Sequence, residues 1–272
     1  MRLDQLLVHR GLFASREQAK RAVMAGGVEV DGRRVDKAGT AVAEDAALRL
    51  TRQPEPFVSR AGRKLDAAFV RFAESVRELD PRAWVCADVG ASTGGFTDCL
   101  LQRGAARVYA IDVGYGQLDL RLRQDPRVVV MERRNARYLG PDDLPEPIRL
   151  ATFDVSFISL AKVVPALVPH LETGGFLLPM IKPQFEAGRG QVGKGGIVRD
   201  EELRRSVIER TVEALLAIGG LACLGVYDSP VTGMGGNREA FALLQCQAEE
   251  QCQAEEPCQA EEPRKVGEGL DV

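Results

Sequence analysis

A glycine-rich turn at residues 88–96 constrains the fold more than any other stretch of the chain. It reads Asp88-Val89-Gly90-Ala91-Ser92-Thr93-Gly94-Gly95-Phe96 and follows an apolar, β-prone run at 83–87. Residues 97–104 then have the apolar spacing of a helix and end at a glycine. A strand, a glycine turn and a helix open the nucleotide-type binding folds, because glycine lets the backbone turn sharply and lets a ligand approach closely.

A second apolar run at 108–111 ends in Asp112, where an acid can accept hydrogen bonds from ribose hydroxyls. The spacing Gly-x-x-x-Gly-Gly suits a dinucleotide or S-adenosylmethionine, and equally a turn needed only for packing. The turn alone therefore leaves these three interpretations open.

Strands and helices alternate through the rest of the chain. Helices are expected from 59 to 72, up to about 170, and over 201–217; further strands are expected at 128–131, 150–153, 175–181, 221–226 and 241–244. This alternation predicts an α/β fold with a parallel sheet and helices on both faces.

Charged residues stand at the ends of four of these predicted strands: Asp88, Asp112, Asp154 and Lys182. Ligand sites of open parallel sheets lie beyond the carboxyl ends of the strands, so these side chains are candidate site residues. A lysine paired with an aspartate in a cleft is suited to activating an alcohol. An isolated lysine, with a pKa of about 10.4, is a poor base at neutral pH.

The first 64 residues are basic, with thirteen Lys and Arg against eight Asp and Glu, although the whole chain carries a net charge of −3. This excess favours a polyanionic partner. The pattern over 3–50 predicts two helices, the second opening at Ser15, and a hairpin turning at Asp31-Gly32. Basic residues that can line one side are Arg10, Arg16, Lys20, Arg21, Arg33, Arg34 and Lys37.

The region 1–50 closely resembles the S4 RNA-binding domain, an α+β module. The similarity rests on Arg2-Leu3-Asp4, Ser15-Arg16 and Ala25-Gly26-Gly27-Val28, followed by Val30-Asp31-Gly32. It implies that the second helix and the hairpin contact structured RNA, mainly through phosphates.

Four residues resemble the Lys-Asp-Lys-Glu tetrad of ribose 2′-O-methyltransferases: Lys64, Asp154, Lys182 and Glu239. With the S4-like region, residues 1–244 resemble the TlyA family, FtsJ-like rRNA 2′-O-methyltransferases that are also known as haemolysins. The similarity rests on three sequence motifs: Gly-Ala-Ser-Thr-Gly-Gly-Phe-Thr, Ser-Phe-Ile-Ser-Leu and Lys-Pro-Gln-Phe-Glu.

The resemblance implies S-adenosylmethionine as cofactor and a Rossmann-like methyltransferase sheet. Lys182 is expected to serve the 2′-hydroxyl, while Asp154 and Glu239 orient the lysines; no metal is required. The implied cofactor residues are Ser59, Arg60, Gly90, Ala91, Ser92, Thr93, Gly94, Gly95, Asp112, Asn135 and Asp154.

The implied reaction is 2′-O-methylation of cytidine in ribosomal RNA, with the large-subunit RNA favoured and the small-subunit RNA as the alternative. The implied partner is rRNA or a ribosomal subunit. The six cysteines include no Cys-x-x-Cys pair, which favours reduced thiols in the cytoplasm over a zinc site. No apolar run long enough to span a bilayer and no secretory signal is expected, so no stable membrane association is expected either.

The expected domains are an S4-like region at 1–50, a linker at 51–58, a methyltransferase domain at 59–245 and an acidic tail at 246–272. The tail repeats Cys-Gln-Ala-Glu-Glu three times and is interpreted as disordered sequence without a function.

Three other functions compete with methyl transfer. A dinucleotide-dependent dehydrogenase accounts for the turn and Asp112 but leaves the RNA-binding region unexplained. A membrane-active haemolysin is disfavoured by the lack of a spanning segment. An RNA-binding protein without catalysis is disfavoured by the intact set of Lys64, Asp154, Lys182 and Glu239.

Overall fold

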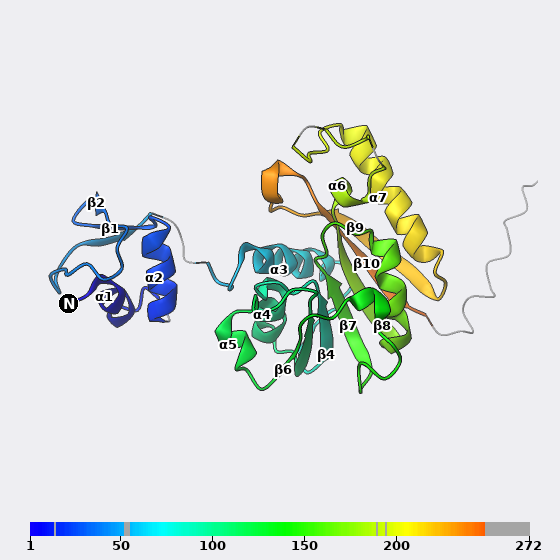
Figure 1. The fold of residues 1–272 in the computed structure, drawn as a ribbon, viewed down its shortest axis with the longest axis horizontal. Helices are drawn as coiled ribbons and strands as arrows, with labels where there is room; N and C mark the ends of the chain where they lie inside the picture. Colours follow the sequence, from blue (N-terminus) through cyan, green and yellow to red (C-terminus); the bar gives the residue numbers. More distant parts are fainter. Residues whose placement is uncertain (14, 52–54, 189, 194, 248–272) are drawn as a thin grey trace, which may run out of the picture. The chain divides into compact units, whose positions relative to one another are not determined.

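The chain divides into two compact units between Arg60 and Ala61 (Figure 1). The computed structural model describes residues 1–13, 15–51, 55–188, 190–193 and 195–247. The acidic tail from 248 onward, and residues 52–54 of the expected linker, lie outside the described residues.

The first unit contains two helices and a small antiparallel sheet, as the sequence predicts. Ser15 caps the second helix by accepting a hydrogen bond from the Gln18 amide at 3.3 Å. The hairpin turns at Asp31 and Gly32, which both have positive φ angles of 50° and 76°. The elements are α1 (Leu3–His9), α2 (Arg16–Met24), β1 (Val28–Val30), β2 (Arg33–Arg34) and β3 (Leu48–Leu50), with strand order β2-β1-β3.

A buried carboxylate ties the two helices of this unit together. Asp4 is 3% exposed and accepts hydrogen bonds from Arg2 at 3.0 Å and from Arg16 at 3.1 Å. The hydrogen bond from Arg2 is the main cause that lowers the pKa of Asp4 below its usual value. Arg16 therefore has a structural role in addition to its predicted contact with RNA.

The second unit is built on a seven-stranded sheet with the order β6-β5-β4-β7-β8-β10-β9. The chain runs outward from β4 on one side and then restarts from β7 on the other, so the strand order reverses between these two strands. The strands are β4 (Val85–Val89), β5 (Arg107–Ile111), β6 (Val128–Met131), β7 (Ile148–Phe153), β8 (Leu171–Ile181), β9 (Leu221–Asp228) and β10 (Ala240–Cys246).

The expectation of a parallel sheet was wrong at the last strand. The strands β4 to β8 pair in parallel, but β10 pairs antiparallel with both β8 and β9. Only the short turn η5 (Met234–Gly236) lies between β9 and β10. A parallel return would need a crossover of a dozen or more residues, usually a helix.

Helices cover both faces of the sheet, as predicted. Along β10, Phe241 packs against Phe96 of α4, while Ala242 belongs to the cluster that includes Leu215 of α7. Alternate residues of a strand point to opposite faces, so both faces are buried. Figure 1 shows helices on either side of the sheet. The helices are α3 (Arg60–Phe72), α4 (Gly95–Gln102), α5 (Leu120–Arg123), α6 (Pro183–Glu186) and α7 (Glu201–Leu216).

The helix expected up to about residue 170 is replaced by three short 3₁₀ turns. These are η2 (Leu160–Lys162), η3 (Val164–Ala166) and η4 (Val168–His170). Pro165 and Pro169 lie within η3 and η4. Proline lacks the amide hydrogen that an α-helix requires, which accounts for the interruption.

Replacing Asp4 with alanine should destabilise the first unit by about 1–3 kcal/mol, because the buried carboxylate accepts charged hydrogen bonds. Since its pKa is lowered on folding, this contribution should be present above the ordinary Asp pKa of about 3.9 and be lost as the pH falls below it. Hydrogen exchange of the α1 amides in the full chain measures the loss. Asp45→Ala removes an exposed carboxylate from the same unit and should change little; equal protection in the two variants would contradict the assignment.

Candidate functional site

A cavity of about 520 Å³ opens at the carboxyl ends of β4, β5 and β7, beside the point where the strand order reverses. Its volume is within the range of small-molecule sites. Two cavities of about 590 and 760 Å³ flank β9 instead, away from these strand ends. We regard the first as the candidate site because it has predicted site residues in its wall: Gly90, Ser92, Asp112, Asn135 and Asp154.

The turn after β4 requires glycine for steric reasons. Gly90 has a φ of +85°, and a Cβ atom there would lie 2.9 Å from the carbonyl oxygen of Asp154. Gly94, with a φ of +97°, precedes the first residue of α4. The main chain of this turn therefore reaches the cavity without intervening side chains. A ligand bound in the cavity can approach the main chain closely there.

The carboxylate of Asp112 is fixed by two backbone amides at the cavity. One oxygen accepts from the Ser92 N–H at 2.8 Å and the other from the Gly114 N–H at 2.6 Å. These bonds join the end of β5 to the glycine turn. Asn135 lies across the cavity, where its side chain caps η1 (Ala136–Tyr138) by accepting from the Arg137 amide at 3.1 Å.

The remaining predicted cofactor residues lie outside this cavity wall or in the first unit. Ala91, Gly94 and Gly95 are buried in the turn, and the carbonyl of Thr93 accepts from the Asp119 amide at 3.1 Å. These four residues shape the turn. Ser59 and Arg60 belong to the first unit, at the start of α3, and their place beside a cofactor stays a prediction.

Lys182 and Asp154 form an ion pair that joins the ends of β8 and β7. The Lys182 Nζ lies 2.6 Å from Asp154 Oδ1, and it also donates to the Asp154 carbonyl at 3.2 Å and to Ser156 Oγ at 2.9 Å. The side chains are 10% and 19% exposed. An ammonium has three donors, so these three acceptors fix its position next to the cavity wall.

The other two members of the predicted tetrad form a second ion pair. Lys64 Nζ of α3 lies 2.5 Å from Glu239 Oε2, and their side chains are 12% and 3% exposed. Ala240 of β10 is paired with Ile181 of β8. By that antiparallel register, Glu239 and Lys182 are the next residues on neighbouring strands, so both pairs lie at the same edge of the sheet.

Several residues of the site were missed by the sequence analysis. Ser156 holds Lys182, and Gln117, Arg134 and Phe157 line the cavity. Phe157 is 90% exposed, has a φ of +62° and packs its ring against Phe185 with centroids 4.7 Å apart. A bulky residue in the left-handed region is strained, and such strain is concentrated at functional sites. The motif containing Ser156 and Phe157 was visible, but nothing in it indicated their exposure.

Two further carboxyl groups stabilise the loops around the site. Asp88, fully buried at the end of β4, accepts from both the amide and the hydroxyl of Thr97, and burial raises its pKa to about 7. Glu186 of α6 accepts from the Leu160 amide at 2.8 Å, and burial raises its pKa as well. These bonds connect β4 to α4 and the loop after β7 to α6.

The basic residues predicted to contact RNA are all exposed on the first unit, and Lys37 is exposed as well. Arg10 also donates to the carbonyl oxygens of Ala46, at 2.9 Å, and of Glu44. Arg10 uses part of its guanidinium in these bonds, and Arg16 uses part of its own in the ion pair with Asp4. Each guanidinium has five N–H donors, so both residues keep donors for phosphate oxygens. The others are Lys20, Arg21, Arg33 and Arg34.

Within the described residues, no cluster of three or more His, Cys, Asp or Glu side chains is arranged to hold a metal ion. In the same part of the chain, none of the helices has the length and apolar character needed to span a membrane.

Family models match both units. The model of the S4 domain matches residues 1–47, and that of the FtsJ-like methyltransferases matches residues 57–246. A solved protein structure from Streptococcus thermophilus is 43% identical, with a TM-score of 0.69 over 91% of this chain and 88% of that one.

Two curated relatives match over most of their length. The "16S/23S rRNA (cytidine-2'-O)-methyltransferase TlyA" of Mycobacterium tuberculosis is 47% identical over 91% of this chain and 91% of the relative. "Hemolysin A" of Brachyspira hyodysenteriae is 41% identical over 89% and 98% of the two chains. With an S4 domain followed by an FtsJ-like methyltransferase domain, this chain belongs to the TlyA family.

Proposed function

We propose that this protein transfers a methyl group from S-adenosylmethionine to the 2′-oxygen of a cytidine in ribosomal RNA. The observation that carries the proposal is the pair of lysine–carboxylate contacts, Lys182–Asp154 and Lys64–Glu239, at one sheet edge beside a cavity. The mycobacterial relative is named for 2′-O-methylation of cytidine in 16S and 23S rRNA.

Two features of the cavity support S-adenosylmethionine as the cofactor. The glycine turn gives access to the main chain, and Asp112 presents a carboxylate held by two amides. In the proposed complex, residues 90–95 contact the methionine part, Asp112 the ribose hydroxyls and Asn135 the adenine edge. When bound, the cofactor supplies a methyl group on a positively charged sulfur.

Lys182 acts on the 2′-hydroxyl in this proposal. It assists removal of the hydroxyl proton and stabilises the negative charge that develops on the oxygen. Asp154 and Ser156 keep Nζ in place through the contacts described above. Glu239 holds Lys64 in the same way, and the orientation of the oxygen toward the methyl group contributes much of the rate.

The first unit binds the RNA through phosphates contacted by its basic side chains, and Phe157 offers an exposed ring on which a base can stack. The proposed partner is rRNA within a ribosomal subunit, which places the enzyme in the cytoplasm. We assign RNA binding to residues 1–50 and methyl transfer to 59–245. A dehydrogenase, a haemolysin or an inactive RNA-binding protein leaves the two lysine–carboxylate pairs without a role.

Purified protein should methylate ribose in isolated large or small ribosomal subunits, located by mass mapping of both rRNAs. Lys182→Ala should slow single-turnover transfer by about 10²–10⁴-fold, with cofactor and RNA affinity nearly unchanged. Lys182→Arg should not restore the rate, because a planar guanidinium cannot replace a compact ammonium.

Lys162→Ala, which removes an exposed lysine from the same unit, is the control and should keep the full rate. If Lys182 only stabilises the fold, Lys182→Ala should melt at a lower temperature and keep its rate per folded molecule. That outcome would rule out the proposed mechanism. The absence of ribose methylation by the unmodified protein on both subunits would rule out the proposed function.

Asp112→Ala should weaken binding of S-adenosylhomocysteine by about 1–3 kcal/mol, because charge-assisted hydrogen bonds to the ribose are lost. Calorimetric titration measures this change, and NAD titrated in the same way tests the dehydrogenase alternative. Asp142→Ala removes an exposed carboxylate of the same unit as a control. Equal affinity in the two variants would exclude Asp112 from the cofactor site.

Lys20→Ala combined with Arg33→Ala should weaken RNA binding and make it less dependent on salt. The slope of log K against log salt concentration should decrease by about 1 for each lost phosphate contact. Filter binding of an rRNA fragment over a salt series measures the slope, with Lys162→Ala as the control. An unchanged slope in the double variant would remove the α2 and hairpin surface from the RNA interface.

A further inference from the structure

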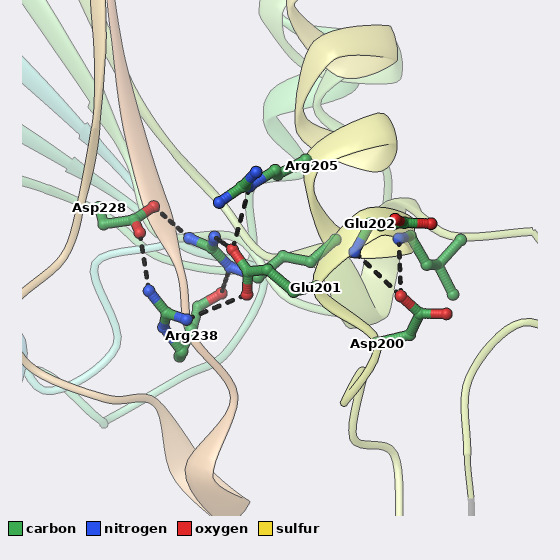
Figure 2. Close-up of polar contacts among 8 residues, drawn as sticks. Asp200, Glu201, Glu202, Arg205, Asp228 and Arg238 are labelled. Carbon is green, nitrogen blue, oxygen red and sulfur yellow. Dashed lines mark hydrogen bonds and ion pairs between the residues drawn. The ribbon is translucent and has the colours of Figure 1, made fainter.

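Three consecutive residues before β10 contact three different parts of the second unit. Asn237, which is 4% exposed, accepts from the Val198 amide at 3.0 Å and donates to the Gly196 carbonyl at 2.8 Å. Glu239 forms the ion pair with Lys64. Arg238, between them, enters a charged cluster on α7 and β9, shown in Figure 2.

The cluster consists of two arginines that share two acids. Arg238 pairs with Glu201 and with Asp228, each at 3.0 Å. Arg204, which is 3% exposed, pairs with the same two acids. Arg204 also donates from Nε to the backbone carbonyl of Arg238 at 3.1 Å. This last bond contacts the main chain and does not involve a charge pair.

The Arg238 carbonyl belongs to the peptide bond that leads into Glu239. On the other side of Glu239, its own carbonyl accepts from the Ser229 amide at 2.8 Å. The two peptide units that flank the Glu239 side chain are thus both held by hydrogen bonds. A displacement of about 1 Å at a reacting group can cost about 10²-fold in rate, so the placement of this backbone matters for a pair in the site.

We propose that Arg204 is a positioning residue for methyl transfer, which fixes the Glu239 backbone so that its carboxylate holds Lys64. This inference rests on the proposed function. It adds a residue from α7, a helix that contributes nothing to the cavity wall among the described residues. Arg204 acts through the main chain, because its hydrogen bonds go to the Arg238 carbonyl, to Glu201 and to Asp228 and not to the Glu239 or Lys64 side chain.

The matched control lies on the next position of the same helix. Arg205 also pairs with Glu201, at 3.5 Å, but its side chain is 72% exposed. Figure 2 shows a dashed line joining its guanidinium to the Glu201 carboxylate. Its ion pair should contribute little, because exposed pairs are weak.

The test compares Arg204→Lys with Arg205→Lys in the full-length protein. Lysine keeps the positive charge next to Glu201 and Asp228 but lacks the Nε donor, so it removes the bond that Nε makes to the Arg238 carbonyl. Arg204→Lys should lower the single-turnover rate at saturating RNA and S-adenosylmethionine by about tenfold or more. Both dissociation constants should stay within about twofold, and Arg205→Lys should match the unmodified protein.

Hydrogen exchange gives a readout that does not need activity. The amides of Ser229 and Gly233 are bonded to the carbonyls of Glu239 and Asn237, and they should exchange faster in Arg204→Lys only. In a Glu239→Gln background, Arg204→Lys should add little further loss of rate, because it acts through Glu239. A merely structural role would instead lower the melting temperature and multiply the two losses.

A folded Arg204→Lys protein with the full rate and unchanged hydrogen exchange would overturn the proposal. A double variant in which the two rate losses multiply would also overturn it. If Arg204→Lys does not fold, Asp228→Asn weakens the anchor of Arg204 at a half-exposed position. It should give a smaller rate loss with the same faster exchange, and no change in either would also overturn the proposal. If the unmodified protein transfers no methyl group, the proposed function is refuted. Hydrogen exchange would still test whether Arg204 fixes the backbone at Glu239.

Discussion

The reversal of strand order between β4 and β7 is the constraint on which the site depends. Because neighbouring strands start their crossovers in opposite directions there, the loops after β4, β5 and β7 part and leave a cavity at the carboxyl ends of the strands. The loop residues Gly90, Asp112 and Asp154 come together there although they are distant in sequence. Close approach of the turn to the Asp154 carbonyl excludes any side chain at Gly90.

The two lysine–carboxylate pairs place four largely buried charged groups at one edge of the sheet. Removing two charges from water costs free energy that mutual attraction recovers only with good geometry and further hydrogen bonds. Lys182 has such bonds to Ser156 and the Asp154 carbonyl. Glu239 is 3% exposed and is held through its backbone as well as through Lys64. These supporting bonds and the neighbouring cavity are the grounds on which we propose a catalytic role for the pairs.

The antiparallel last strand determines where Glu239 lies in the proposed site. In a wholly parallel sheet, the residue before β10 would lie at the amino-terminal edge, far from the ends of β7 and β8. Because β10 runs the other way, Glu239 enters the sheet next to Lys182, within reach of Lys64 on α3. The reversed strand thus brings Glu239 to the other three residues of the set. Arg204 of α7 bonds the carbonyl of Arg238, just before this strand.

The sequence alone determined the alternation of elements, the glycine turn, Asp112 at the end of β5 and the four charged residues, because these signals are local in the chain or form short motifs. Sequence patterns could not determine partners: which lysine meets which acid depends on strand order and on the direction of β10. The 3₁₀ turns in place of a helix reflect Pro165 and Pro169, a local signal that was misread. The exposure of Phe157 and the buried bond from Arg204 to the Arg238 carbonyl were decided only by the tertiary structure, since burial and backbone contacts arise when distant segments pack.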